Sequence, residues 1–63
     1  MQGRNIPTRW REVHVWQDFR GWAVDQVDDG GASLRACGLS LIDAVNLGRR
    51  IAAELDCNLL VAP

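Results

Sequence analysis

Apolar and polar residues alternate on both sides of the segment Asp18-Phe19-Arg20-Gly21, and this pattern constrains the fold more than any other feature of the sequence. The alternating residues are Val13, His14, Val15 and Trp16 before the segment, and Trp22, Ala23, Val24 and Asp25 after it. A period of two is typical of a half-buried strand. The pattern therefore predicts two strands joined by a four-residue loop, with the three valines and Trp22 on one face.

A third strand is predicted over residues 32–36, after a second turn. The pair Asp29-Gly30 is a strong hairpin signal, because glycine accepts the left-handed conformation that short loops need. A three-residue loop over 28–30 would place Val24 opposite Leu34 and Trp22 opposite Ala36. A slip by one residue would instead place Arg35 beneath the helix described next, where burying an unpaired charge is costly.

One amphipathic helix of about four turns is predicted after Gly38. Ser40 is a candidate N-cap, and Asp43 places negative charge in the first turn. The apolar positions recur at helical spacing and are Leu41, Ala44, Val45, Gly48, Ile51, Ala52 and Leu55. A helix-turn-helix alternative would break the helix near Gly48, but no second cap follows that residue. The helix should end near residues 56–58, before a short buried strand over residues 59–62.

The predicted fold class is α+β, with the order β-β-β-α-β, a mostly antiparallel sheet and one amphipathic helix on one face. Residues 12–63 would form a single small domain, and residues 1–11 an irregular basic arm with three arginines and no acid. A chain of 63 residues builds only a small core. Such chains usually gain stability from disulfides, a metal or oligomerisation.

The sequence has no apolar stretch long enough to span a membrane and no secretory signal, so we expect a cytoplasmic protein of bacterial or phage type. Cys37 and Cys57 lie on either side of the predicted helix, which would be roughly 24 Å long. A disulfide needs Cα atoms within about 7 Å. We therefore predict two free thiols, consistent with a reducing compartment.

No catalytic constellation is evident. His14 is the single histidine, and the sequence lacks the Cys and His spacing of a zinc site. Cys57 could approach His14 if the last strand runs beside the first, but a Cys-His nucleophile also needs a pocket. Gly30-Gly31 joins two strands, so it is not a phosphate-binding loop. We predict no enzyme activity, no cofactor, no metal and no small-molecule substrate.

One helix cannot cover both faces of the sheet, so the opposite face becomes the candidate site. The residues predicted on it are His14, Trp16, Ala23, Asp25, Ser33, Arg35 and Cys37. The candidate interface residues are Trp16, His14, Arg35, Phe19 and Trp10. Trp and Arg are enriched among interface hot spots. The alternative is that this face has no binding role and is a solvated outer face with one apolar residue.

The function that these residues favour is a non-enzymatic binding module. It would act by self-association, for example as a homodimer, or by binding another protein, through the helix-free face or a sheet edge. A phage-type inhibitor role is left open. The alternative is a protein that binds single-stranded nucleic acid through the basic arm and the face carrying Trp16 and Arg35. Against this, residues 12–63 have a net charge of −4, from four arginines and eight acids.

Short segments of the sequence resemble the small bacterial domain-of-unknown-function family 2188. They are His14-Val15-Trp16, Gly21-Trp22-Ala23-Val24, the helix positions Ser40, Ala44, Arg49, Ile51 and Ala52, and Leu59-Leu60-Val61. The resemblance covers about residues 13–61. Asp43 stands where members of the family usually have Glu, and the family commonly continues with a turn and another short strand. The resemblance implies a fold and no catalytic residues.

Overall fold

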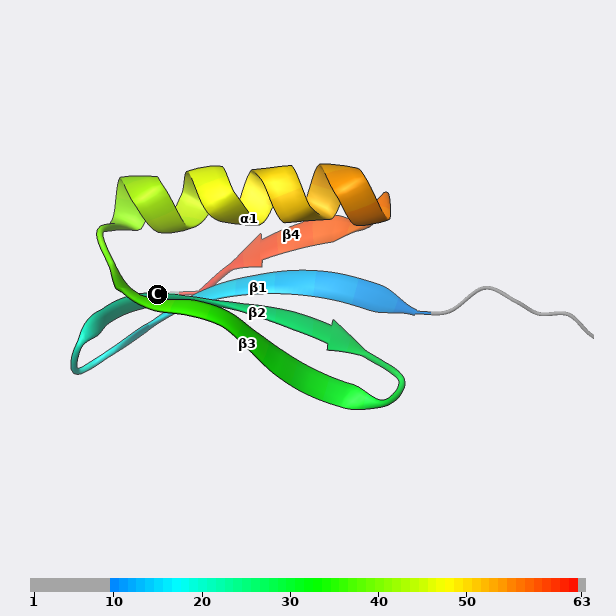
Figure 1. Cartoon of the computed structure of the whole chain (residues 1–63), viewed down its shortest axis with the longest axis horizontal. Coiled ribbons are helices and arrows are strands. Elements are labelled where there is room, and N and C mark those ends of the chain that lie inside the picture. Colours follow the sequence, from blue (N-terminus) through cyan, green and yellow to red (C-terminus); the bar gives the residue numbers. More distant parts are fainter. Residues whose placement is uncertain (1–9, 63) are drawn as a thin grey trace, which may run out of the picture.

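A computed structural model describes residues 10–62 and confirms the α+β class and the predicted order of elements (Figure 1). The elements are β1 (Arg11–Asp18), β2 (Gly21–Asp28), β3 (Gly31–Leu39), α1 (Leu41–Leu55) and β4 (Asn58–Val61). Arg11, predicted as the last residue of the basic arm, is the first residue of β1. Residues 1–9 of that predicted arm lie outside the described residues, and Trp10 comes immediately before β1.

The four strands form one mixed sheet in the order β3-β2-β1-β4. β1 and β2 pair in antiparallel fashion with Val15 opposite Val24 and Gln17 opposite Trp22, which is the predicted register. The turn is tighter than predicted, because Asp18 and Gly21 still pair and only Phe19 and Arg20 lie outside the strands. β4 runs parallel to β1 at the edge of the sheet.

The predicted register between β2 and β3 is wrong. Asp28 pairs with Gly31, so the turn has two residues instead of three, and Asp25 lies opposite Leu34. The backbone N–H of Gly30 donates to Oδ1 of Asp28 at 2.8 Å, which holds the tight Asp-Gly turn. Two irregularities then shift the ladder so that Val24 faces Ala36 and Trp22 faces Leu39. These shifts return Ala36 and Leu39 to the helix side of the sheet after the slip at the turn.

The helix begins and ends with the expected local chemistry. The Ser40 side chain accepts a hydrogen bond from the Asp43 backbone N–H at 3.1 Å, as an N-cap does. Asp56 adopts a left-handed conformation with a φ of 54° and closes the C-terminus through a hydrogen bond to Ala53 O. The helix continues through Gly48, so the helix-turn-helix alternative is wrong.

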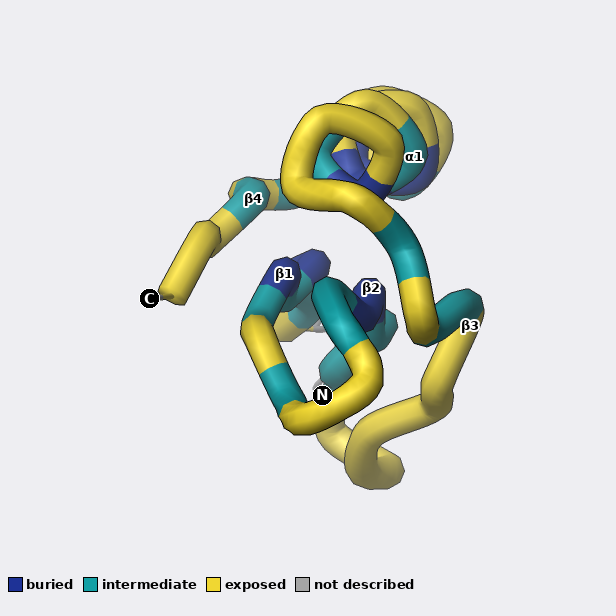
Figure 2. Tube along the Cα trace, turned by 90° about the vertical axis from the view of Figure 1, so that its left-hand side faces the viewer, coloured by how far each residue is buried: buried dark blue, intermediate teal, exposed yellow. Residues whose placement is uncertain are grey.

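The core lies between α1 and one face of the sheet (Figures 1 and 2). Its fully buried residues include Val13, Val15, Val24 and Ala44, and Ile51 and Ala52 complete the cluster. Valine is the largest side chain among the fully buried ones. Trp22 packs against this cluster without being fully buried, so it borders the core and does not form its centre. Among residues 10–62, α1 is the one helix and it packs on one side of the sheet, so the opposite face has no covering layer there.

Candidate functional site

The face of the sheet opposite α1, here called the open face, is set by strand alternation. β1 buries Val13 and Val15 under the helix, so the side chains of Glu12, His14 and Trp16 point to the other side. The β1–β2 register adds Ala23, Asp25 and Val27, and the adjoining strands add Leu34 and Leu60. This face therefore combines apolar side chains with a few polar partners.

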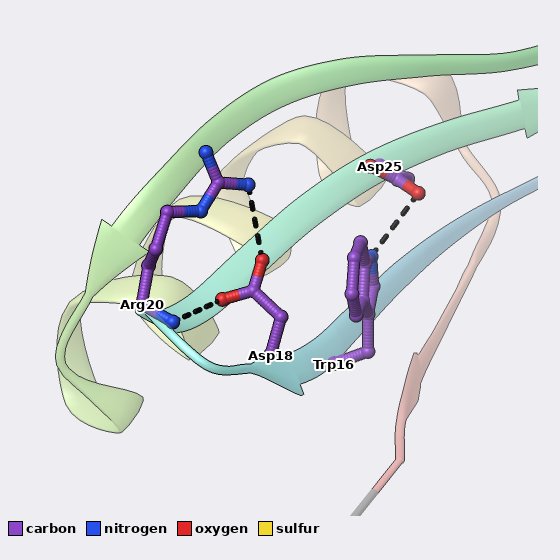
Figure 3. Close-up of polar contacts among 4 residues, drawn as sticks. All are labelled: Trp16, Asp18, Arg20 and Asp25. Atoms are coloured by element: carbon purple, nitrogen blue, oxygen red, sulfur yellow. Dashed lines mark hydrogen bonds and ion pairs between the residues drawn. The ribbon is translucent and has the colours of Figure 1, made fainter.

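Trp16 is the centre of the open face. It lies opposite Ala23, and its indole Nε1 donates a hydrogen bond to Oδ2 of Asp25 at 3.1 Å (Figure 3). Ala23 is 0% exposed although it lies on the side of the sheet away from the helix. The indole contributes to that cover, because directly opposed side chains lie close together in an antiparallel pair. The hydrogen bond fixes the orientation of the ring, so Trp16 presents a defined apolar surface.

His14 and Glu12 form a second polar pair on the open face. The two residues are two apart on β1, and Nε2 of His14 lies 3.0 Å from Oε1 of Glu12. On the other side of His14 is Leu60 of β4, which is 46% exposed. The parallel position of β4 beside β1 thus extends the open face with an apolar residue.

The β1–β2 turn is held by Asp18 and Arg20. The Asp18 carboxylate accepts from the Arg20 backbone N–H at 2.7 Å and from the Arg20 guanidinium at 3.1 Å (Figure 3). The backbone hydrogen bond from Arg20, followed by the side-chain and charge interactions with Arg20, lowers the pKa of Asp18 below its ordinary value of 3.8. Phe19, at the tip, is 94% exposed, and the Arg20 guanidinium lies 5.4 Å from its ring centroid.

The structure does not place Arg35 on the open face with Trp16, as the sequence predicted. Arg35 lies where the β2–β3 register shifts, and its Nη1 donates to Oε1 of Gln26 at 2.6 Å. Gln26 is two residues after Val24 on β2, so its side chain points to the same face as that of Val24, which is in the core. Arg35 is exposed, so the slip does not bury its charge. Ser33 pairs with Gln26, so it too lies on the helix side of the sheet and not on the predicted face.

The other candidate residues are divided between the open face and its surroundings. His14 and Trp16 lie together on β1, whereas Phe19 is at the turn and Trp10 lies just before β1 with 50% exposure. The residues of the open face that the sequence did not predict are Glu12 and Val27, together with Leu34, which is 57% exposed, and Leu60. Leu34 reached the open face through the register slip, and Leu60 through the placement of β4, for which the sequence carries no local signal.

Cys57 and His14, the candidate Cys-His pair, lie on opposite sides of the sheet. Cys57 packs against the core cluster, whereas His14 is on the open face and pairs with Leu60. A Cys-His nucleophile needs the two side chains within hydrogen-bonding reach. Both Cys37 and Cys57 are free. Within residues 10–62, no group of three or more His, Cys, Asp and Glu side chains is arranged to hold a metal ion.

In comparisons with protein-family models, curated proteins and solved structures, nothing matches this chain. The resemblance to family 2188 stays a prediction. Among the described residues, no helix is both long enough and apolar enough to cross a membrane.

Proposed function

We propose that this chain is a non-enzymatic association module that binds protein through its open face or an adjoining sheet edge. The partner is a second copy of the chain or another protein. The observation that carries the proposal is the apolar surface on the side of the sheet away from α1, formed by the half-buried Trp16 and the exposed Leu34 and Leu60. A small domain with little core gains stability when a partner covers such a face.

Several features of the open face support a protein partner. Trp16 is a large and oriented aromatic side chain, which is the kind of residue that carries much of the binding energy at interfaces. The polar groups beside it already have partners, since Asp25 accepts from Trp16 and His14 contacts Glu12. Each of these groups therefore already has one partner within the chain before another protein covers the face.

Single-stranded nucleic acid is the alternative ligand for the same face, and the geometry supports it less. Stacking of bases on Trp16 would need nearby cations for the phosphates. Arg35 points elsewhere, and the open face carries the carboxylates of Asp25, which contacts Trp16, and of Glu12. Titration with a labelled oligonucleotide at several salt concentrations tests this alternative. Tight binding that weakens steeply as salt rises would favour nucleic acid over protein.

The test of the proposal is the molar mass in solution, measured by light scattering or sedimentation equilibrium up to high micromolar concentration. We expect the wild-type chain to associate and the Trp16→Ala variant to associate about tenfold more weakly or worse, as at a hot spot. Ile42→Ala is the matched control, since Ile42 is 72% exposed and lies on α1 instead of the open face. A strict monomer would contradict self-association, and equal effects of the two substitutions would contradict the open face.

A further inference from the structure

The two edges of the sheet differ in their protection against further strand pairing. The β3 edge has two register irregularities, an exposed Arg35 and a positive φ of 70° at Gly38. Proteins commonly use short edge strands, bulges, charges and proline to keep an edge from pairing. β4 is short, but its four residues include no charge, proline or bulge and are in regular register with β1. Two of them are also large, apolar and exposed, since Leu60 is 46% and Val61 48% exposed.

The backbone of β4 presents hydrogen-bonding groups outward. The N–H of Ala62 donates to Val15 O at 2.8 Å, so the β4 backbone at that position faces β1. Along a parallel ladder, alternate residues direct both their N–H and C=O groups to the same neighbour. The N–H and C=O groups of Leu60 therefore also face β1, whereas those of Leu59 and Val61 point to the outer edge, where no strand of residues 10–62 pairs with β4. An added extended strand matches this row of donors and acceptors.

We infer that a second copy of this chain supplies the strand, with the two β4 strands pairing in antiparallel fashion. This inference rests on the proposed function and names its partner and its contact. The two-fold axis would pass beside Leu60, and Leu59 would pair with Val61 of the second copy. Each of these two reciprocal pairs exchanges two hydrogen bonds, which gives about four between the copies.

A second copy fits this edge because the segment is complementary to itself. Leu59, Leu60 and Val61 are all apolar, so antiparallel pairing brings no like charges together. The axis places the two Leu60 side chains next to each other, on the face that also carries His14. Such a contact is closed by its own symmetry. The two sheets would become one, with both helices on one side and the two open faces joined on the other.

Proline at position 61 tests the hydrogen bonds at the edge. Val61→Pro removes an N–H that points outward and keeps those of Leu60 and Ala62, and proline is tolerated on edge strands. Val61→Thr is the matched control, because it keeps both the N–H and the β-branched shape. In sedimentation equilibrium we expect the dimer Kd to rise about tenfold or more for proline and to stay within about threefold for threonine. Circular dichroism verifies that each variant folds.

Cross-linking tests the position of the axis without relying on proline. Leu60→Cys and Asn58→Cys are each made in a chain carrying Cys37→Ala and Cys57→Ala. The axis brings the two positions 60 within disulfide range, about 4.5 Å between Cα atoms. The two positions 58 are offset by about four residues, or roughly 13 Å along the strands. Under mild oxidation we expect a covalent dimer from Leu60→Cys and little from Asn58→Cys.

The outcomes separate this inference from the proposed function. A dimer weakened by Val61→Pro and cross-linked through Leu60→Cys supports the β4 contact. A dimer that Trp16→Ala weakens, that Val61→Pro leaves unchanged and that cross-links equally at both positions overturns the β4 contact and leaves the open face as the interface. A strict monomer at high micromolar concentration overturns the inference together with self-association.

Discussion

Gly48 lies where α1 packs closely on the sheet, and replacing it with alanine tests the contact between the helix and the sheet. A Cβ atom added to Gly48 would lie 2.9 Å from Cγ2 of Val15 and 2.9 Å from Cδ1 of Leu59. The Leu59 contact is with the end of a flexible side chain on an edge strand, so it can yield. Val15 is 0% exposed and its side chain is stiff about χ1, so it cannot move without disturbing the core.

Two effects of opposite sign decide the result of Gly48→Ala. Alanine favours the helical backbone over glycine by about 1 kcal/mol. Overpacking a close-packed core costs about 1–3 kcal/mol, and the stiff Val15 contact places this site above the low end of that range. We therefore expect a net destabilisation of about 1 kcal/mol. For a domain of this size, this corresponds to a decrease in Tm of roughly 4–8 °C.

Thermal and urea unfolding followed by circular dichroism measure this change. Asn46→Ala is the matched control, because Asn46 is exposed in the middle of the same helix and should gain up to about 0.7 kcal/mol from helix propensity alone. Gly48→Ala should also cost less in a chain carrying Val15→Ala, where the methyl groups of Val15 are absent. A rise in Tm for Gly48→Ala similar to that for Asn46→Ala would refute the close helix-sheet contact.

Two further predictions concern local hydrogen bonds. Asp18→Asn keeps an oxygen acceptor for the turn but removes the ionisable carboxyl group, whose pKa is lowered by its interactions with Arg20. Because the pKa is lower in the folded state, the Asp18 charge stabilises the fold above about pH 4, and this contribution is lost as the pH falls below the ordinary value of 3.8. Stability measured against pH should therefore fall less steeply at acid pH in Asp18→Asn than in wild type; identical profiles would contradict this. Ser40→Ala removes the N-cap acceptor for the Asp43 N–H and should cost about 1 kcal/mol in urea unfolding, whereas Ser40→Asp should keep most of it. An unchanged midpoint for Ser40→Ala would show that the cap is not formed.

The sequence predicts the parts of the fold that depend on neighbours in the chain. The period of two fixed the first hairpin and its register, and Ser40 marked the start of the helix correctly. The predicted turn of the second hairpin is one residue too long, because Asp28-Asp29-Gly30 suits both a two-residue and a three-residue turn. The bulges that restore the apolar pairing have no distinct sequence signal here, so the position of Arg35 could not be predicted.

The sequence predicts the candidate interface residues that lie on β1 but not the one that β4 adds. Trp16 and His14 follow from alternation along β1, which is a local property. Leu60 joins them only because β4 lies parallel beside β1, and that placement depends on where the chain returns after α1. Local periodicity gives the face of each strand but not the order of the strands in the sheet.

The uncovered face follows from the proportions of the fold. Neighbouring strands lie about 4.8 Å apart, and a helix with its side chains is about 10 Å wide. α1 therefore covers about half the width of one face of the four-stranded sheet and none of the other. Burial of Ala23 shows that side chains of the sheet itself exclude water from part of the open face. Trp16 has a structural role in this cover, so the binding effect of Trp16→Ala is to be measured at temperatures where the variant is still fully folded.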